Sequence, residues 1–425
     1  MRQRFCHCFV LILLIAFQGL NGQEVFPLKK ELVWSKPGEE IVTPQFSPDG
    51  NFVVLVTRAY WPDGGDAEGL PDSFFQQLSA RAKANPRFAD PVVKVVDLSG
   101  KVVCEARYGW NPSLSRDDKR IVFSEQVKPI TGYRELASPE AGNGIRVFDC
   151  ETKELTKIAD PVTGYLDTPF FSPDDGSIVY TENEAVNGAF GGSVGIARFD
   201  LQQNRVIALV KKEMVAAIPC PPANSKQSSL EEFRCSQVKD LTSSFPQIVF
   251  YVAPTGRDVV ALLGTPVPSA GDSYLAQNYD MRLVSVLPEQ RTILPLGKRS
   301  MESDDNTTFQ AVSGERVLVF QQYWKLFSID SREILAQIGP KNMKPKSVYS
   351  PDLKYYLCAE PEGDPNHFVL YRTADGKQIE SFPKMALVYD AFWSSQSNRF
   401  GIVELPMTGA SAVNHREELA VYSVP

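Results

Sequence analysis

One segment of the chain has the spacing of a catalytic serine motif. Gly191-Gly192-Ser193-Val194-Gly195 matches the pattern Gly-x-Ser-x-Gly, which in hydrolases places a nucleophilic serine on a turn between a strand and a helix. Here the following residues, Ile196 to Phe199, are typical of an extended strand. After the first 22 residues only His367 and His415 could act as a general base. The sequence therefore favours a glycine-rich hairpin and predicts no catalytic residue.

An acidic loop is the next candidate for chemistry, because it could hold a cation. Asp63, Asp66 and Glu68 lie close together among glycines, and calcium takes its oxygen ligands from such loops. Their spacing differs from that of an EF-hand, which favours a solvated acidic loop and leaves these residues as weak calcium candidates. No cysteine–histidine cluster has zinc spacing. We therefore predict no bound metal or cofactor, with calcium as the one alternative.

Aromatic residues supply the candidates for partner binding. Tyr60 and Trp61 follow a predicted strand, and Trp110 lies between two predicted structural units. Exposed aromatic residues are typical of protein interfaces. The alternative, which we prefer, is packing between neighbouring sheets, since large apolar residues are usually buried.

The elements that would position these residues are marked by a repeated turn. Phe46-Ser47-Pro48-Asp49-Gly50 precedes the apolar run Phe52 to Val56. Related segments precede three more apolar runs: Phe171-Ser172-Pro173-Asp174-Asp175-Gly176, Tyr349-Ser350-Pro351-Asp352 and the degenerate Ser115-Arg116-Asp117-Asp118-Lys119. Proline presets φ for a turn, Ser and Asp hydrogen-bond nearby backbone, and Gly accepts a positive φ. A recurring unit of turn and strand predicts a repeat architecture.

The apolar runs after these turns do not alternate with polar residues, which is typical of strands buried on both faces. About seven units of this kind can be drawn, each holding up to four strands. The last unit is one strand short, whereas Leu28 to Trp34 forms an extra strand before the first. We therefore predict an all-β, single β-propeller, with seven blades and with this N-terminal strand completing the last blade and closing the ring.

The Phe-Ser-Pro-Asp-Gly turn followed by an aliphatic and aromatic strand resembles the TolB-like or PD40 repeats of WD40-like β-propellers. The resemblance covers roughly Val42 to Pro425 and implies a propeller fold. The chain departs from TolB, which carries an α/β domain ahead of its propeller. Here only Gln23 to Gly38 lie between a signal-like segment, residues 1–22, and the first unit. It departs from the prolyl oligopeptidase relatives, because no residues remain for a hydrolase domain. The resemblance therefore indicates a fold and leaves the activity open.

Length, charge and cysteines add further bounds. Met1 to Gly22 has two arginines, an apolar core and a small residue, as a secretory signal does. Residues 23–425 would form the propeller, with insertions at 60–91 and 214–241. The formal charge of −7 argues against nucleic acid as a partner. Cys220 and Cys235 flank a polar loop and are the predicted disulfide, and Asn306 is a predicted glycosylation site in a eukaryotic host.

These features together predict a secreted or periplasmic binding or scaffold module. Its partner would be a protein or peptide, and after removal of the signal it would not span a membrane. The predicted insertion at 60–91 would supply the recognition element, because binding residues lie on loops held by a rigid scaffold. The alternative is a propeller enzyme, such as a lactonase-like hydrolase, with a metal in the central funnel.

Overall fold

The computed structural model defines the part of the chain on which the following description rests. The described residues are 28–60, 72–87, 89–127, 143–162, 164–183, 193–212, 248–267, 278–300, 309–312, 315–321, 323–338, 347–359, 368–382, 386–406 and 416–424. The predicted signal, Trp61, the acidic loop with Asp63, Asp66 and Glu68, the Cys220–Cys235 pair and Asn306 lie outside these residues.

The described residues are nearly all-β, as predicted, and their strands pair antiparallel in six sheets. The first two sheets each hold four strands in chain order: β2 (Glu39–Phe46), β3 (Phe52–Ala59), β4 (Val92–Asp97) and β5 (Val102–Arg107), then β6 (Gly109–Leu114), β7 (Arg120–Glu125), β8 (Ile145–Asp149) and β9 (Leu155–Ala159). Each sheet is thus a simple up-and-down meander.

An eight-stranded sheet follows. Its first half holds β10 (Tyr165–Phe171), β11 (Ser177–Asn183), β12 (Ser193–Asp200) and β13 (Arg205–Val210). Its second half holds β14 (Ile248–Pro254), β15 (Val259–Val267), β16 (Asn278–Leu287) and β17 (Arg291–Ser300). Only the Ser193–Val249 pair between β12 and β14 joins the halves, so each half repeats the four-strand meander.

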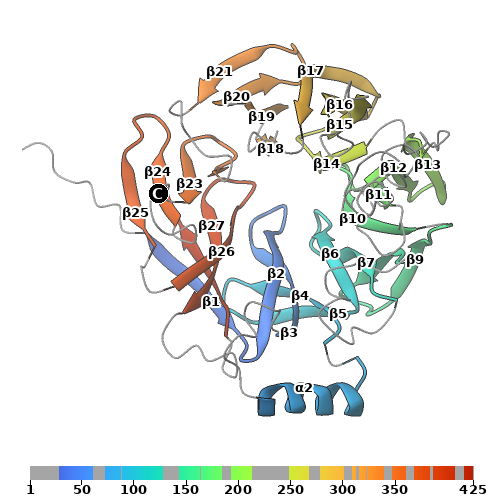
Figure 1. Ribbon diagram of the computed structural model, residues 1–425, viewed down its shortest axis with the longest axis vertical. Coiled ribbons are helices and arrows are strands. Elements are labelled where there is room, and N and C mark those ends of the chain that lie inside the picture. The colour runs from blue at the N-terminus through green and yellow to red at the C-terminus, as the bar shows by residue number, and fades with distance from the viewer. Residues whose placement is uncertain are drawn as a thin grey trace, which may run out of the picture.

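Three four-stranded sheets complete the described fold. They are β18 (Phe309–Val312), β19 (Arg316–Gln321), β20 (Tyr323–Ser328) and β21 (Ile334–Ile338); β22 (Val348–Tyr349), β23 (Tyr355–Ala359), β24 (Phe368–Arg372) and β25 (Gln378–Ser381); and β26 (Ala386–Trp393), β27 (Arg399–Pro406) and β28 (Glu418–Ser423) with β1 (Lys29–Ser35). Figure 1 shows the sheets arranged around a central opening, with β2, β6, β10, β14 and β18 near it.

The first described strand pairs with the last. β1 runs antiparallel to β28, with Lys29 opposite Ser423 and Ser35 opposite Glu418. Figure 1 shows the blue β1 beside the red strands of the C-terminal sheet. Leu32 of β1 is buried and packs in one cluster with Val421 of β28 and Val53 of β3. The N-terminal strand therefore contacts both the last sheet and the first.

The cores lie between successive sheets. Val54 of β3 and Val95 of β4 pack in one cluster with Ile121 and Phe123 of β7. Every residue from Val53 to Val56 has 0% of its surface exposed, because neighbouring sheets cover both faces of β3. This burial explains why the second strand of a unit has a continuous apolar sequence.

A turn built on a buried serine joins the first two strands of five sheets. In each, the hydroxyl of the serine accepts a hydrogen bond from the backbone N–H that opens the next strand, at 2.9–3.3 Å. In four of them the same hydroxyl donates to the Asp two residues later, at 2.5–2.8 Å. The serines are Ser47, Ser115, Ser172, Ser350 and Ser394, none more than 5% exposed. The fifth copy, at Ser394, lacks the Pro and Asp that mark the motif in the sequence.

The fourth position of this turn always has a positive φ, as in a type I turn followed by a left-handed residue. Gly50 has φ 76°, but the equivalent residues are Asp118 (59°), Asp175 (54°), Leu353 (66°) and Ser397 (62°). The sequence suggested Gly176 for this role in its unit, and that was wrong: Asp175 is the left-handed residue. The turn is therefore fixed by the serine and needs no glycine.

Neighbouring turns are bonded to one another. The Asp352 N–H donates to the Ser397 hydroxyl (2.8 Å) and the Arg116 N–H donates to the Asp175 carboxylate (2.9 Å). The Ser395 hydroxyl donates to the Pro48 carbonyl at 2.6 Å, across 347 residues of sequence. Asp49 and Asp118 share a side-chain hydrogen bond. The five serine turns therefore form one connected row, which we call the turn face.

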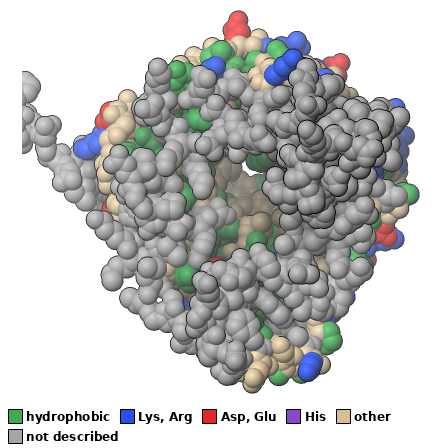
Figure 2. Space-filling model, viewed as in Figure 1, with side chains coloured by type: hydrophobic (Ala, Val, Ile, Leu, Met, Phe, Trp, Pro, Cys, Tyr) green, Lys and Arg blue, Asp and Glu red, His purple; other side chains and the backbone are tan. Residues whose placement is uncertain are grey.

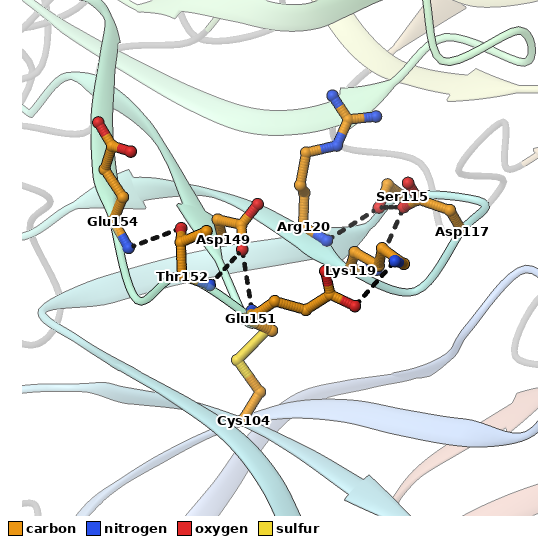
Figure 3. The surroundings of a disulfide bond; sticks show 10 residues. Cys104, Ser115, Asp117, Lys119, Arg120, Asp149, Glu151, Thr152 and Glu154 are labelled. Carbon is orange, nitrogen blue, oxygen red and sulfur yellow. Dashed lines mark hydrogen bonds and ion pairs between the residues drawn. A yellow bond between two sulfur atoms is a disulfide. The ribbon is translucent and has the colours of Figure 1, made fainter.

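A disulfide links the first two sheets near the turn face. Cys104 of β5 bonds to Cys150, which directly follows β8 (Figure 3). The Cys150 N–H donates to the Lys119 carbonyl at 2.8 Å, and the Lys119 ammonium pairs with Glu151 at 2.8 Å. The disulfide, a backbone hydrogen bond and an ion pair thus meet at one corner.

Cys358, a free cysteine in β23, is buried in the core.

The opposite ends of the strands define a second face, which we call the loop face. Because the strands alternate in direction, β3 ends at this face and β4 begins there. The same holds for four more pairs, in each of which the first strand ends and the second begins at this face: β7 and β8, β11 and β12, β23 and β24, and β27 and β28. These strand ends bound the longer intervening segments. Between β3 and β4 lies α2 (Asp72–Ala84), matching the helical spacing of Phe74, Phe75 and Leu78, and Leu78 is 5% exposed.

The buried serine turn predicts a measurable cost of substitution. Ser172→Ala removes the acceptor for the Ser177 N–H, which stays buried, so the free energy of unfolding should fall by about 1–3 kcal/mol. Ser99→Ala is the matched control, because Ser99 also bonds to an Asp two residues away but is exposed; it should cost less than about 0.5 kcal/mol. Urea unfolding measures both. Equal losses would contradict the role assigned to the buried hydroxyl.

Candidate functional site

Two arginines and two aromatic rings meet at the loop face, where the first two sheets adjoin. The Arg58 guanidinium lies 5.3 Å from the centre of the Trp110 ring, and the Arg87 guanidinium lies 4.4 Å from the centre of the Tyr108 ring. These four residues, which we call the Arg–aromatic cluster, are all half-buried. Arginine and large aromatic residues are the types that contribute most to protein interfaces.

Each member of the cluster is held by further contacts. The Trp110 Nε1–H donates to the Gln126 side chain at 2.6 Å, and Arg58 pairs with Glu40. The opposite side of Trp110 packs against the core between the first two sheets. Trp110 therefore combines the predicted packing between sheets with partial exposure, while its role in partner binding stays a prediction.

Arg87 connects the segment after α2 to the sheets. Its guanidinium pairs with Asp90 at 2.9 Å and donates to the Val127 carbonyl at 2.9 Å. Ala89 and Asp90 are 0% and 4% exposed. The C-terminal end of the predicted 60–91 insertion is therefore packed into the body of the protein. At its other end Tyr60 is half-buried, and its N–H donates to the Gly38 carbonyl at 3.1 Å.

Two cavities flank the Arg–aromatic cluster, and Arg87 and Tyr108 line both. One, of about 640 Å³, is bounded by the Lys36–Glu39 turn, Lys94 and Arg107. The other, of about 480 Å³, is bounded by Glu125, Gln126, Arg146 and Asp160. These volumes fall within the range of ligand-sized clefts.

Several of the charges beside these cavities are paired. Burial alone would raise the pKa of Glu39, but the ammonium groups of Lys36 and Lys94 hold that pKa below its ordinary value. Arg146 bridges Glu125 (2.7 Å) and Asp160 (2.9 Å). These ion pairs hold the charged side chains of the cavity walls in place, as the pairs with Glu40 and Asp90 hold Arg58 and Arg87 of the cluster.

The other sequence candidates fare differently. Ser193 of the Gly-x-Ser-x-Gly pattern begins β12, an extended strand as expected, and its hydroxyl donates to Asn183 at 2.6 Å. Within the described residues no group of three or more His, Cys, Asp or Glu side chains could hold a metal ion. In the same part of the chain no helix is long and apolar enough to cross a bilayer.

Sequence reasoning missed Arg58 and Arg87, because no local pattern marks an arginine that stacks on a distant ring.

No protein-family model matches the chain, and no curated protein sequence matches it. Among solved structures, the β-propeller domain of Cps50 (Swd1) from Myceliophteria thermophila is similar, with 10% identity, coverage of 94% of this chain and 100% of that one, and a TM-score of 0.49. The β-propeller domain of the Trilobed protease from Pyrococcus furiosus is also similar, with 15% identity, coverage of 90% and 95%, and a TM-score of 0.45.

The turn face has electrostatics of its own. Asp118 lies near the carboxylates of Asp49, Asp117 and Asp175, and burial together with these like charges raises its pKa from 3.8 to about 7. Asp174 behaves in the opposite way, because the Ser172 hydroxyl and the Gly176 N–H hold its pKa below the ordinary value. A protonated Asp118 can donate to Asp49, which links two neighbouring turns.

This arrangement predicts a pH dependence of stability. Between about pH 4 and pH 7 the folded protein keeps the Asp118 proton that the unfolded chain has lost, so stability should fall as pH rises through this window. Asp118→Asn keeps a donor toward Asp49 and tolerates the left-handed backbone, so its melting temperature should fall less between pH 5 and pH 8.

The control for this experiment is Asp97→Asn. The pKa of Asp97 is lowered, chiefly by the Ser99 hydroxyl, so Asp97 does not titrate between pH 5 and pH 8. The melting temperature of this variant should therefore change with pH as that of the wild type does. Parallel curves for wild type and Asp118→Asn would show that Asp118 is not the titrating group.

Proposed function

We propose that this protein is a single seven-bladed β-propeller of residues 23–425, secreted or periplasmic, that acts as a non-catalytic binding or scaffold module for a protein or peptide. The observation that carries the binding proposal is the contrast between the two faces. The turn face consists of short turns that bond to one another, whereas the loop face carries the Arg–aromatic cluster and two cavities.

The blade count is supported by the strand pairing. Counting the eight-stranded sheet as two blades gives seven four-stranded units, since one residue pair joins its halves. In the last unit β1 occupies the outermost position beside β28. We propose that this pairing closes the ring, as the sequence predicted. The bonds from Ser395 and Gln396 to the Pro48–Asp49 turn connect the same two units at the turn face.

The proposed compartment and the proposed class of partner are supported by different observations. The signal-like sequence of residues 1–22 supports export, and the disulfide is compatible with an oxidising compartment. The partner class follows from the cluster, because cation–π pairs and partly exposed rings suit a protein surface more than a small ion. Tyr60, Trp61 and Trp110 remain the sequence-based candidates for this contact.

Closure of the ring can be tested with two neighbouring substitutions in β1. Leu32 is 3% exposed and Val33 is 49% exposed. Leu32→Ala should lower the free energy of unfolding by about 2–5 kcal/mol, because it leaves a cavity between the first and last sheets. Val33→Ala should change it by less than about 0.5 kcal/mol. If urea unfolding shows that both are nearly neutral, β1 is not an integral strand of the ring.

Partner binding can be tested with a random peptide library displayed on phage. Peptides enriched on the wild type should bind Tyr108→Ala and Arg87→Lys roughly tenfold more weakly, since both changes remove stacking in the cluster. Lys119→Ala on the turn face is the control and should bind as the wild type does. No enrichment, or peptides sensitive to Lys119→Ala alone, would contradict the assignment to the loop face.

A further inference from the structure

The central opening contains a third cavity, of about 450 Å³, separate from the two beside the Arg–aromatic cluster. Its walls come from β2, β6, β10 and β14, with Thr181 and Ser193 from neighbouring strands. Figure 2 shows that the face turned to the viewer is hollowed at its centre, where the coloured side chains are mostly hydrophobic or uncharged.

The described residues that line this cavity carry hydrogen-bonding groups but no charge. Its polar side chains are the hydroxyls of Thr43, Ser113, Thr168, Thr181 and Ser193 and the amides of Gln45 and Asn111. No described residue that lines it is Lys, Arg, His, Asp or Glu. Phe250 and Tyr251 add aromatic surface, and Tyr251 is 46% exposed. Such a lining suits a neutral ligand with many hydroxyl groups and apolar ring faces.

The polar groups are held in place by a repeated backbone feature. Thr43, Asn111 and Thr168 each precede a proline on three successive inner strands, and their φ values are 47°, 46° and 45°. The register of β2, β6 and β10 shifts at these same positions. Left-handed non-glycine residues are uncommon, and they gather at sites where the surrounding structure holds them.

Side-chain contacts behind the cavity fix the direction of the amides and hydroxyls. The Asn111 amide NH₂ donates to the Asp167 carboxylate at 2.8 Å, which turns its carbonyl oxygen the other way. The Gln45 amide donates to the Pro112 carbonyl. The Thr168 and Thr181 hydroxyls are 2.8 Å apart. The donors and acceptors of the lining are therefore oriented before a ligand arrives.

The same bulges disfavour a peptide in this cavity. A peptide that adds to a sheet edge needs an uninterrupted row of backbone donors and acceptors. Pro44, Pro112 and Pro169 remove donors from three of the four inner edges, and each register shift breaks the row. The uncharged lining also offers no partner for a peptide terminus or a phosphate.

We infer that the central cavity is a binding site for a neutral saccharide of one or two sugar rings, a role that goes beyond the proposed binding of a protein or peptide at the loop face. Hydroxyls and amides of the inner strands pair with the sugar hydroxyls, and the Tyr251 ring packs against an apolar face of the sugar.

A glycan array followed by isothermal titration calorimetry tests this inference. The array holds neutral mono- and disaccharides, including cellobiose, maltose and N,N′-diacetylchitobiose, beside glucuronic acid and glucose 6-phosphate as charged counterparts. The full-length protein should retain at least one neutral saccharide, and its charged counterparts should bind more than about tenfold more weakly, because no cation lines the cavity.

Variants assign the binding to the cavity. Tyr251→Ala and Asn111→Asp should each weaken the affinity for the retained saccharide about tenfold, the first by loss of the ring and the second by loss of the amide that donates to Asp167 and orients the side chain. Thermal unfolding checks that each variant is folded, and Tyr251→Ala stands alone if Asn111→Asp is not. Lys119→Ala on the turn face, remote from the lining, is the control and should bind the saccharide as the wild type does.

Several results would overturn the inference. These are retention of no neutral saccharide, equal retention of charged ones, or affinity that neither cavity variant changes. Binding of tetraalanine with the same sensitivity to Tyr251→Ala, in place of saccharide binding, would assign the cavity to peptides. None of these results depends on the peptide library, so failure here is distinguishable from failure of the loop-face proposal.

Discussion

A buried serine hydroxyl that bridges a turn and the strand after it is the interaction on which this fold depends. The hydroxyl accepts an N–H at 2.9–3.3 Å in five sheets. The serine is buried in each turn, and at Ser172 the bond itself is buried, so its loss there leaves a buried donor unsatisfied. The turn also places a left-handed residue at a fixed position, and that residue or its neighbours contact the next turn. A local hydrogen bond is thus converted into contact between sheets.

The row of turns has a consequence for function. The turn face is occupied by contacts between neighbouring turns. Longer segments of the chain lie at the other strand ends, between β3 and β4, β7 and β8, and β11 and β12. The Arg–aromatic cluster lies at these ends, and the uncharged cavity lies inside the ring. A face of mutually bonded turns opposite a face of longer segments is consistent with the binding module that we propose.

The sequence predicted the local features well and the distant ones poorly. The turns at Ser47, Ser172 and Ser350 and the strands after them follow from proline, serine and aspartate chemistry. The turn at Ser394 was missed, since Ser395 and Gln396 stand there in place of the Pro and Asp of the Ser47 copy. The contact between Leu28–Trp34 and the last strands was inferred from an unpaired strand, and β1 pairs with β28 in the structure.

What could not be predicted depends on residues brought together by the ring. Cys104 and Cys150 belong to different sheets, so spacing gave no sign of their disulfide, and the predicted Cys220–Cys235 pair lies outside the described residues. Arg58 and Arg87 meet Trp110 and Tyr108 only after β3 and β6 lie side by side. The Thr-Pro and Asn-Pro pairs at 43–44, 111–112 and 168–169 are visible in the sequence, but nothing in the sequence shows that all three lie at the central opening.

Amide hydrogen exchange read by mass spectrometry is the most direct test of the central claim, that buried serine turns hold neighbouring blades together. The account predicts slow exchange for the N–H groups of Phe52, Arg120, Ser177, Tyr355 and Arg399, which bond to the five serines. The outer turns at 98–101 and 201–204 should exchange much faster. Equally fast exchange at the serine turns and the outer turns would contradict the account.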